Sequence, residues 1–411
     1  EFVSLTPSGP RIKPMRCERG ESREEREKRE KQERVVSFVL FALHSPLSCS
    51  ILFPVLPSTT VAILDTGRIP QGRRSRDDRV RLMTRLIRYL PPEARRVLIL
   101  VNATAGARAG ESRVDQLRQQ LAASGLQVET FTDPAALGRA VGNRCDRSIR
   151  AVVAAGGDGT VAAVVNATPP GTPVTVLPLG TENLLAKYLA YPFSLDALRH
   201  TILHGATVAL DAGRAGDRLF LLMVGCGFDA HVVRGLHRHR RGHIRHTTYI
   251  KPILESICRY AYPEIRIECA PRGAAGQPSG SPASGAARWV FVVNLPMYAG
   301  GLRIVPDAVG TDGLVDVCLF ERGSLAHGLR YLSGILRGRH PEWEDCRCVR
   351  AERVRIESDG EVPYQLDGDP GGVLPVEIAA MPGRMCALVT ETWAVRHGFQ
   401  HAAEEAAGKC L

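Results

Sequence analysis

Residues 149–160 read IRAVVAAGGDGT, and this stretch decides the fold. Its first seven residues are almost all apolar, which is typical of a strand buried on both faces of a parallel sheet. The glycines that follow permit positive φ and let a ligand approach the backbone closely. A helix that starts here would direct its N-terminal amides at an anion. The stretch therefore predicts a strand, a phosphate-binding loop and a helix; the other interpretation is an ordinary strand-to-helix turn.

Neighbouring segments repeat this arrangement. Short apolar strands are expected at Val97–Val101, Gln127–Phe131 and Val174–Leu177, with a helix at Val114–Ser124. Strands that alternate with helices indicate a parallel sheet with crossover helices. Because ligands of open α/β sheets bind at the carboxyl ends of the strands, the loop at 178–183 (PLGTEN) should lie beside the GGDGT loop.

The pattern changes after about Asp211. Strand-like segments now follow one another with few helical patterns, which predicts a β-rich second domain. The expected strands are Leu219–Val224, Ile265–Cys269, Trp289–Leu295, Val315–Phe320, Arg353–Ser358, Val376–Ala379 and Cys386–Val389. Helices are expected at Tyr249–Tyr260 and Leu325–Arg337, and residues 271–287 have the composition of a flexible loop.

The N-terminal region differs from the rest. Residues 17–34 alternate charge signs with almost no apolar content, and the apolar run Val35–Leu43 is too short to span a membrane. A long charged segment before the apolar region also argues against a signal peptide. We therefore expect neither a membrane-spanning helix nor a signal peptide in this region. One interpretation of the region is that translation of the native protein starts near Met83.

Composition narrows the class of protein. The chain has 411 residues, a net charge of +10 and 11 cysteines without disulfide-dense spacing, which favours a reducing compartment and anionic partners. Cys346 and Cys348 form a CxC pair that lacks further ligands at zinc-finger spacing, so we interpret them as ordinary thiols.

A second candidate site lies far downstream at Gln365-Leu-Asp367-Gly-Asp369. Its two carboxylates flank a glycine, and paired carboxylates can share metal coordination and general-base duty. On spacing alone, an ordinary β-turn is the favoured interpretation of the segment. In the GGDGT loop, Asp158 would be repelled by phosphate and suits Mg²⁺, often held through water.

Five motifs in order carry a family resemblance. They are GGDGT, PLGTxN, GxGFDA (225–230), GG…PxAxxxDG (300–313) and LDG followed by an acid. Together, over about Arg95–Thr390, they resemble the diacylglycerol kinase catalytic-domain family, which includes bacterial lipid kinases and sphingosine kinases. The resemblance implies an α/β nucleotide domain with a Rossmann-like parallel sheet, a C-terminal β-sandwich, and an active site in the cleft between them. It also implies ATP, Mg²⁺ and a lipid acceptor.

The resemblance also assigns boundaries and residues. The expected parts are a poorly ordered extension at 1–92, an ATP-binding domain at 93–210, a lipid-substrate domain at 211–392 and a tail at 393–411. Asp369 is the candidate general base, with Asp367 as the less favoured one. Metal-binding positions are Asp158, Asp211 and Asp312. The nucleotide-binding residues are Asn102, Gly106, Gly156, Gly157, Asp158, Gly159, Thr160, Gly180, Thr181 and Asn183.

Three positions depart from the family pattern. Ala163 and Leu184 stand where the family usually has Glu and Asp, and Asp369 stands for its longer Glu. These departures leave a catalytically inactive lipid-binding protein as an alternative. An NAD kinase and a phosphofructokinase-type sugar-phosphate kinase share a GGDG-like loop, but the downstream motifs argue against both.

The partners follow from the family and the charge. The basic stretch at 234–246 (RGLHRHRRGHIRH) suits either contact with an anionic membrane or an exposed charged loop. Nucleic acid is not expected, because no aromatic residues interleave with the basic ones. We expect a cytoplasmic, peripherally membrane-associated enzyme of lipid metabolism and phospholipid biosynthesis, with a homodimer left open.

Overall fold

The computed structural model describes residues 85–102, 107–142, 146–191, 194–238, 260–270, 283–298 and 301–401. All of them belong to one compact unit, Pro70–Leu411. The predicted helix at 249–260 lies outside the described residues except for Tyr260, which is not helical, and the predicted loop at 271–287 lies outside them except for Ala283–Ala287, which form a strand.

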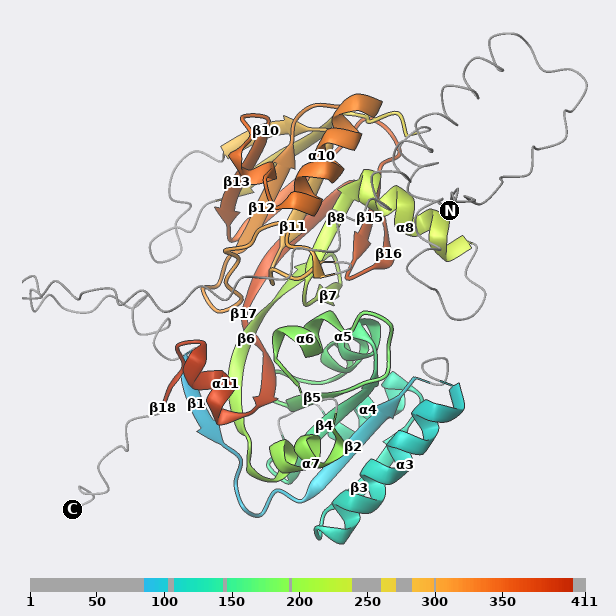
Figure 1. Ribbon diagram of the computed structural model, residues 1–411, viewed down its shortest axis with the longest axis vertical. Helices are drawn as coiled ribbons and strands as arrows, with labels where there is room; N and C mark the ends of the chain where they lie inside the picture. The colour runs from blue at the N-terminus through green and yellow to red at the C-terminus, as the bar shows by residue number, and fades with distance from the viewer. Residues whose placement is uncertain are drawn as a thin grey trace, which may run out of the picture. The chain divides into compact units, whose positions relative to one another are not determined.

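The first lobe has strands that alternate with helices (Figure 1). Its elements are β1 (Leu86–Tyr89), β2 (Arg96–Val101), α3 (Ala107–Ala123), β3 (Gln127–Phe131), α4 (Pro134–Val141), β4 (Ile149–Gly156), α5 (Asp158–Ala167), β5 (Pro173–Pro178), α6 (Leu184–Tyr188), α7 (Leu195–His204) and β6 (Ala206–Ala215). β5, β4, β2 and β3 pair in that order and run parallel. The predicted Rossmann-like sheet is thus confirmed.

Alternate side chains of the parallel strands enter two different cores. On one face, Leu98 and Val152 pack with α4 and α5, and on the other Val97 and Val153 pack with α3 and α7. Both faces are covered because the apolar run of β4 has no polar side to leave in water. Burying its apolar surface stabilises the fold by ~25 cal/mol per Å². Helix α4 starts sharply because the Asp133 carboxylate accepts two backbone N–H bonds at its N-cap.

The second lobe is a β-sandwich with helices. Its elements are β7 (Arg218–Phe220), β8 (Met223–Gly227), α8 (Phe228–Arg238), β9 (Ile265–Ala270), β10 (Ala283–Ala287), β11 (Trp289–Val293), β12 (Val315–Phe320), α10 (Leu325–Arg337), the 3₁₀ helix η5 (His340–Glu342), β13 (Cys346–Ala351), β14 (Arg353–Glu357), β15 (Pro363–Leu366), β16 (Asp369–Val373) and β17 (Val376–Val389). One sheet has the order β13-β12-β11-β8-β15-β16. β9, β10, β14 and the first part of β17 belong to the other sheet.

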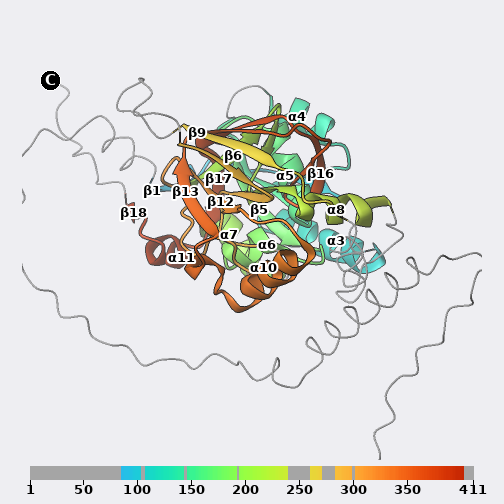
Figure 2. The same cartoon turned by 90° about the horizontal axis from the view of Figure 1, so that it is seen from above.

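The two sheets face each other across an aliphatic core. Val290 and Val317 of the first sheet meet Ile267 and Ile356 of the second there. Helix α10 covers the outer face of the six-stranded sheet (Figures 1 and 2). Its Tyr331 packs on Phe320 of β12. The predicted β-sandwich is therefore confirmed.

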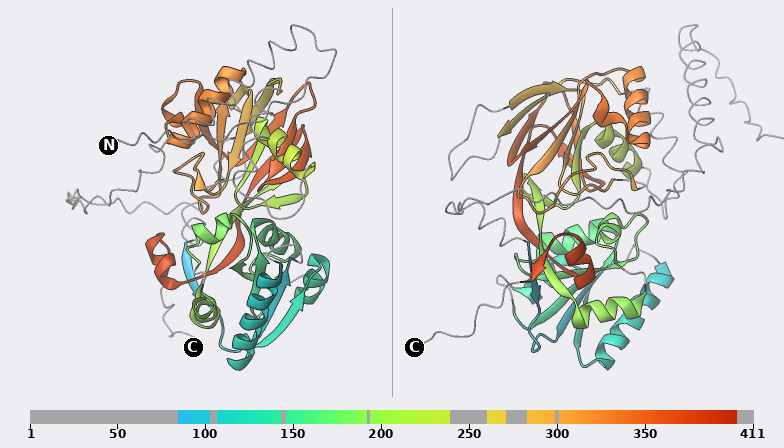
Figure 3. Two further views of the ribbon diagram at one scale, coloured as in Figure 1. Left: turned by 45° about the vertical axis from the view of Figure 1, so that its right-hand side comes forward. Right: turned by 60° about the vertical axis from the view of Figure 1, so that its left-hand side comes forward.

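Strand β17 connects the lobes. It is 14 residues long, pairs with β14 near Val376–Ala379, and pairs in parallel with β5 through Cys386 and Ala387. β6 runs antiparallel beside it with a shift in register between Met381 and Met385, so one sheet continues through both lobes (Figures 1 and 3). Sequence analysis predicted two separate strands here, both in the second domain.

Segments near both predicted boundaries pack on the first lobe. β1, within the segment assigned to the extension, pairs with β6. Near the C-terminus, α11 (Glu391–Arg396) and β18 (Gln400–His401) follow β17, and the buried Trp393 donates its indole N–H to the Tyr188 carbonyl at 3.0 Å. Apolar side chains such as Trp393 and Phe399 explain why these segments join the core.

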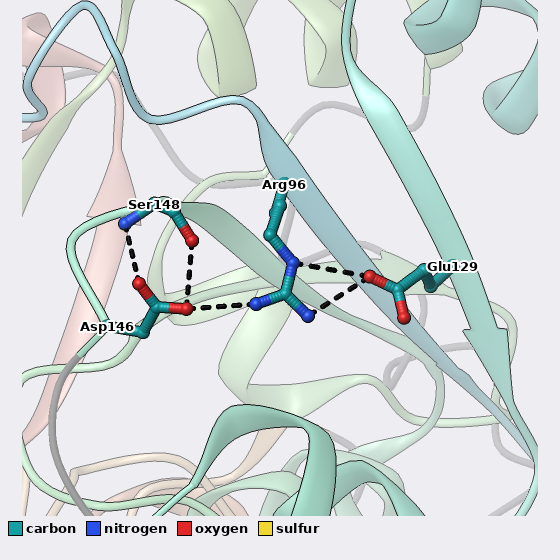
Figure 4. Close-up of polar contacts among 4 residues, drawn as sticks. All are labelled: Arg96, Glu129, Asp146 and Ser148. Atoms are coloured by element: carbon teal, nitrogen blue, oxygen red, sulfur yellow. Dashed lines mark hydrogen bonds and ion pairs between the residues drawn. The ribbon is translucent and has the colours of Figure 1, made fainter.

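A polar cluster stabilises the edge of the parallel sheet where β2 begins (Figure 4). Arg96 lies 2.9 Å from Asp146 and 3.1 Å from Glu129, which joins β2 to β3 and to the turn before β4. The backbone N–H of Ser148 donates to Asp146 and lowers the pKa of that carboxyl. This cluster lies at the start of β2, whereas the predicted ligand loops follow the strands' carboxyl ends.

Candidate functional site

The GGDGT loop joins β4 to α5 and depends on its glycines. Gly157 is the N-cap of α5, and a Cβ on Gly156 would lie 2.1 Å from the Thr160 hydroxyl. The buried Thr160 also receives a hydrogen bond from the Asn102 side chain at 3.4 Å. The loop after β2 and the loop after β4 are thus brought together as predicted, while Gly106 lies outside the described residues.

The loop after β5 lies directly against the GGDGT loop. A Cβ on Gly180 would come within 2.5 Å of the Gly157 Cα, and the Leu179 N–H donates to the Gly156 carbonyl at 3.0 Å. Asn183 has positive φ, and its side chain bonds both the N–H (3.0 Å) and the carbonyl (2.8 Å) of Gly180. The side-chain amide of Asn183 therefore holds the backbone of this loop in place through two hydrogen bonds to Gly180.

Thr181 is exposed in this loop. Lys187, on α6, lies 3.7 Å from Glu182. Thr181 thus belongs to a solvent-facing part of the loop, and the charge of Lys187 is balanced by Glu182.

Asp158 is used by the protein itself. Its two carboxylate oxygens accept hydrogen bonds from the Leu184 and Leu185 amides, each at 2.9 Å, at the start of α6. Burial raises the pKa of Asp158, and these amide bonds act in the opposite direction. Leu184, where the family usually has an acid, is buried and supplies one of the amides. The predicted metal role of Asp158 stays a prediction, with the amide bonds as a second, structural role.

The two downstream carboxylates have different surroundings. Asp367 has positive φ, and its carboxylate accepts hydrogen bonds from the backbone N–H groups of residues 221–223 at 2.7, 2.9 and 2.9 Å. Burial raises the pKa of Asp367 to about 6. Asp369 lies at the start of β16, and its Oδ2 is 3.3 Å from where a Cβ on Gly159 would be. Asp367 thus anchors the turn, and Asp369 faces the GGDGT loop.

The other two predicted metal positions organise a different junction. Asp211 is buried on β6 and accepts hydrogen bonds from the Gly313 and Gly383 amides, each at 2.7 Å, while Asp312 caps the Leu314 amide at 3.0 Å. Within the described ranges, no group of three or more His, Cys, Asp or Glu side chains is arranged to hold a metal ion. The predicted metal roles of Asp211 and Asp312 therefore stay predictions.

Sequence reasoning missed the partners behind the turn. Gln365 and Tyr298 both donate to Asp229 of the GFDA motif, and all three come from different elements. The GFDA motif was a signal for Asp229, and Gln365 stands at the start of the predicted turn segment without an assigned role, but nothing local in the sequence marked Tyr298.

The remaining predicted features lie outside the site. Cys346 is buried 3.7 Å from the Cys318 sulfur, and Cys348 is exposed. Of the basic stretch at 234–246, residues 239–246 lie outside the described residues, and Arg234 pairs with Glu361 at 2.9 Å. None of the helices that the structure describes has the length and apolar character needed to cross a membrane.

Comparison with known proteins agrees with this arrangement. The profile of the diacylglycerol kinase catalytic domain matches residues 96–215, and that of the YegS C-terminal NAD kinase beta sandwich-like domain matches residues 222–389. A diacylglycerol kinase of Mycobacterium tuberculosis is 30% identical over 252 residues, covering 58% of this chain and 76% of the relative. One from Bacillus subtilis is 25% identical over 291 residues, covering 69% and 92%.

Solved structures support the fold. The crystal structure of a diacylglycerol kinase from Bacillus anthracis superposes with a TM-score of 0.54 at 20% identity, covering 72% of this chain and 98% of that one. Taken with the two matched domains and the relatives, the ordered loops and the turn identify the chain as a member of the diacylglycerol kinase catalytic-domain family, a family of lipid kinases.

Proposed function

We propose that this chain is an ATP- and Mg²⁺-dependent kinase that phosphorylates the hydroxyl of diacylglycerol or a related lipid such as a long-chain base. The observation that carries the proposal is the proximity of Asp369 Oδ2 to Gly159. A carboxylate is thereby held beside a glycine loop that suits the phosphates of a nucleotide. The names of the relatives support diacylglycerol as the first acceptor to test.

In the proposed reaction, Asp369 accepts the proton of the lipid hydroxyl. That oxygen forms a bond to the γ-phosphorus while the bond from phosphorus to the bridging oxygen of the ADP leaving group breaks. Phosphoryl transfer depends mainly on positioning and charge stabilisation, so a rigid loop and one well-placed base are sufficient protein contributions. The turn anchored by Asp367 and the loop around Gly159 supply these two elements.

The residues fit ATP and a cation that arrives with it. The contact between Gly157 and Gly180 excludes side chains from the loop junction, which leaves backbone amides to bind phosphate. Mg²⁺ usually keeps several waters and binds through one or two carboxylates plus the substrate phosphates, where it offsets their charge. Asp158 would bind such a cation through water, since each of its oxygens already accepts one amide.

Phosphate transfer from labelled ATP tests the proposal. The acceptors are diacylglycerol, a long-chain base and NAD, with and without Mg²⁺, and the proteins are the wild type, Asp369→Asn and Asp369→Glu. We expect a labelled lipid, a rate about 10²–10⁴-fold lower for Asn, and partial activity for Glu. Melting temperatures should stay close together, because Asn suits a turn as well as Asp does.

The same assay separates the alternatives. An inactive lipid-binding protein, which Ala163 and Leu184 favour, would bind lipid vesicles and transfer no phosphate to any acceptor. Labelled NADP without labelled lipid would indicate an NAD kinase. Equal rates for wild type and Asp369→Asn would exclude Asp369 as the base.

Contact with an anionic membrane surface at the cytoplasmic side is part of the proposal. The support is the net charge of +10 and the basic stretch at 234–246. Each basic residue near such a surface contributes about 1 kcal/mol, and salt weakens the attraction. Flotation with phosphatidylserine vesicles at low and high salt tests it; binding that is unchanged by salt and lipid charge would exclude an electrostatic contact.

A further inference from the structure

A buried series of hydrogen bonds lies behind the turn that carries Asp369. The Tyr298 hydroxyl donates to Oδ1 of Asp229, and Nε2 of Gln365 donates to Oδ2 of Asp229 at 2.8 Å. Oε1 of Gln365 then accepts the N–H of Gly368 at 2.7 Å. Gln365 is 1% exposed and Asp229 5%, so water does not compete for the bond between these two side chains.

Three separate segments of the second lobe meet in this series. Asp229 lies on α8, Gln365 lies on β15 between β8 and β16, and Tyr298 follows β11. A Cβ on Gly225 of β8 would lie 2.1 Å from Oδ2 of Asp229 and 2.9 Å from Nε2 of Gln365. The first glycine of the GxGFDA motif, Gly225, is therefore needed to leave room for the side chains of Asp229 and Gln365.

Hydrogen bonds on both sides fix the orientation of the Gln365 amide. The Gly368 N–H can only donate, so the oxygen of the Gln365 amide must face Gly368, and its NH₂ faces the Asp229 carboxyl on the other side. Burial raises the pKa of Asp229, and the Tyr298 and Gln365 bonds act in the opposite direction. The Gln365 amide thus links Asp229 of α8 to the backbone of the turn through two hydrogen bonds.

We infer that Gln365 and Asp229 are positioning residues for Asp369. The turn is held at two successive residues: the Asp367 carboxylate is fixed by the amides of residues 221–223, and the Gly368 N–H is fixed by Gln365. Asp369 is the next residue, so its direction toward Gly159 depends on both anchors. The catalytic side of this inference rests on the proposed role of Asp369; the structural side does not.

Exchange of the two side chains tests the inference. In Asp229→Asn, the Asn oxygen can face the Gln365 NH₂ and the Asn NH₂ can face the Tyr298 oxygen, so the hydrogen bonds can form and only the carboxylate is lost. In Gln365→Glu, two carboxyls meet in a buried site. In the double variant Asp229→Asn/Gln365→Glu, the amide and carboxylate have changed places, every hydrogen bond can form again, and the net charge is that of the wild type.

We expect Gln365→Glu to lower kcat about tenfold or more, Asp229→Asn to change it less than about threefold, and the double variant to recover to within about threefold of the wild type. The KM for ATP should change less than about twofold, because neither side chain belongs to the glycine loops. Tyr331→Phe is the matched control: it removes a buried 2.9 Å hydrogen bond to Asp345 in the same lobe and should change stability without changing kcat.

Hydrogen exchange of the segment 364–373 gives a readout that needs no activity. Faster exchange in Gln365→Glu and restored protection in the double variant support the positioning role even if the wild type phosphorylates no lipid. A double variant that is no better than Gln365→Glu, or a Gln365→Glu protein with wild-type kcat and wild-type exchange, overturns the inference. Loss of kcat with unchanged exchange overturns it as well, because the turn would then not have moved.

Discussion

The substitution Asp367→Asn tests the role that the structure gives to the buried carboxylate of the turn. Oδ2 of Asp367 accepts the Leu221 N–H, and Oδ1 accepts the N–H groups of Leu222 and Met223. An Asn side chain has one oxygen, so at best it keeps the two bonds at Oδ1 and turns its NH₂ toward Leu221. The variant loses one acceptor and the negative charge, while its shape is conserved.

The magnitude follows from the pKa. Burial raises the pKa of Asp367 from 3.8 to about 6, so the folded state holds the proton more tightly than the unfolded chain. The stability that protonation contributes is present below about pH 4 and is lost as the pH rises through about 6. Two pKa units correspond to about 3 kcal/mol, and we take about 2 kcal/mol because the residue keeps some contact with solvent.

Urea unfolding of both proteins between about pH 4 and pH 7 measures this difference. The free energy of unfolding of Asp367→Asn, relative to the wild type, should rise by about 2 kcal/mol over that range, since the Asn variant cannot ionise. Titrating groups that do not interact with Asp367 cancel in the comparison; Asp158 interacts with it and contributes to the difference. Two curves that stay parallel across the range would refute the reasoning and show that Asp367 titrates at an ordinary pKa.

Three further substitutions address the loops and the sheet. Gly180→Ala places a Cβ 2.5 Å from the Gly157 Cα, and this overpacking should cost about 1–3 kcal/mol and weaken ATP binding in calorimetry. Asp158→Asn sets an NH₂ against one of the two amides at the start of α6 and should lower both turnover and the melting temperature; a loss of turnover alone would favour a purely metal-binding role. Arg96→Leu removes two partly exposed ion pairs at the start of β2 and should lower stability by about 1 kcal/mol with kcat unchanged; a fall in kcat would show that this cluster is coupled to the site.

Much of the first lobe could be predicted from the sequence because its signals are local. An apolar run of strand length, followed by glycines and a helical pattern, specifies a buried parallel strand and a loop whatever the rest of the chain does. The sequence predicted strands close to β2, β3, β4 and β5 in this way. The approach of the loops after β4 and β5 followed from the parallel order, since the carboxyl ends of such strands meet at one edge.

The pairing of β17 and the roles of the carboxylates were decided only by the tertiary structure. β17 pairs with β5, which lies more than 200 residues earlier in the sequence. A pattern of alternating apolar residues predicts a strand but does not indicate which other strand it pairs with. Asp367 and Asp369 are chemically identical and two residues apart, yet one binds amides 144–146 residues away and the other faces Gly159. Whether a carboxylate holds a turn or acts as a base depends on the hydrogen-bond donors that folding places around it. Every residue except proline has a backbone amide, so the residue types do not show which distant amides will bind a given carboxylate.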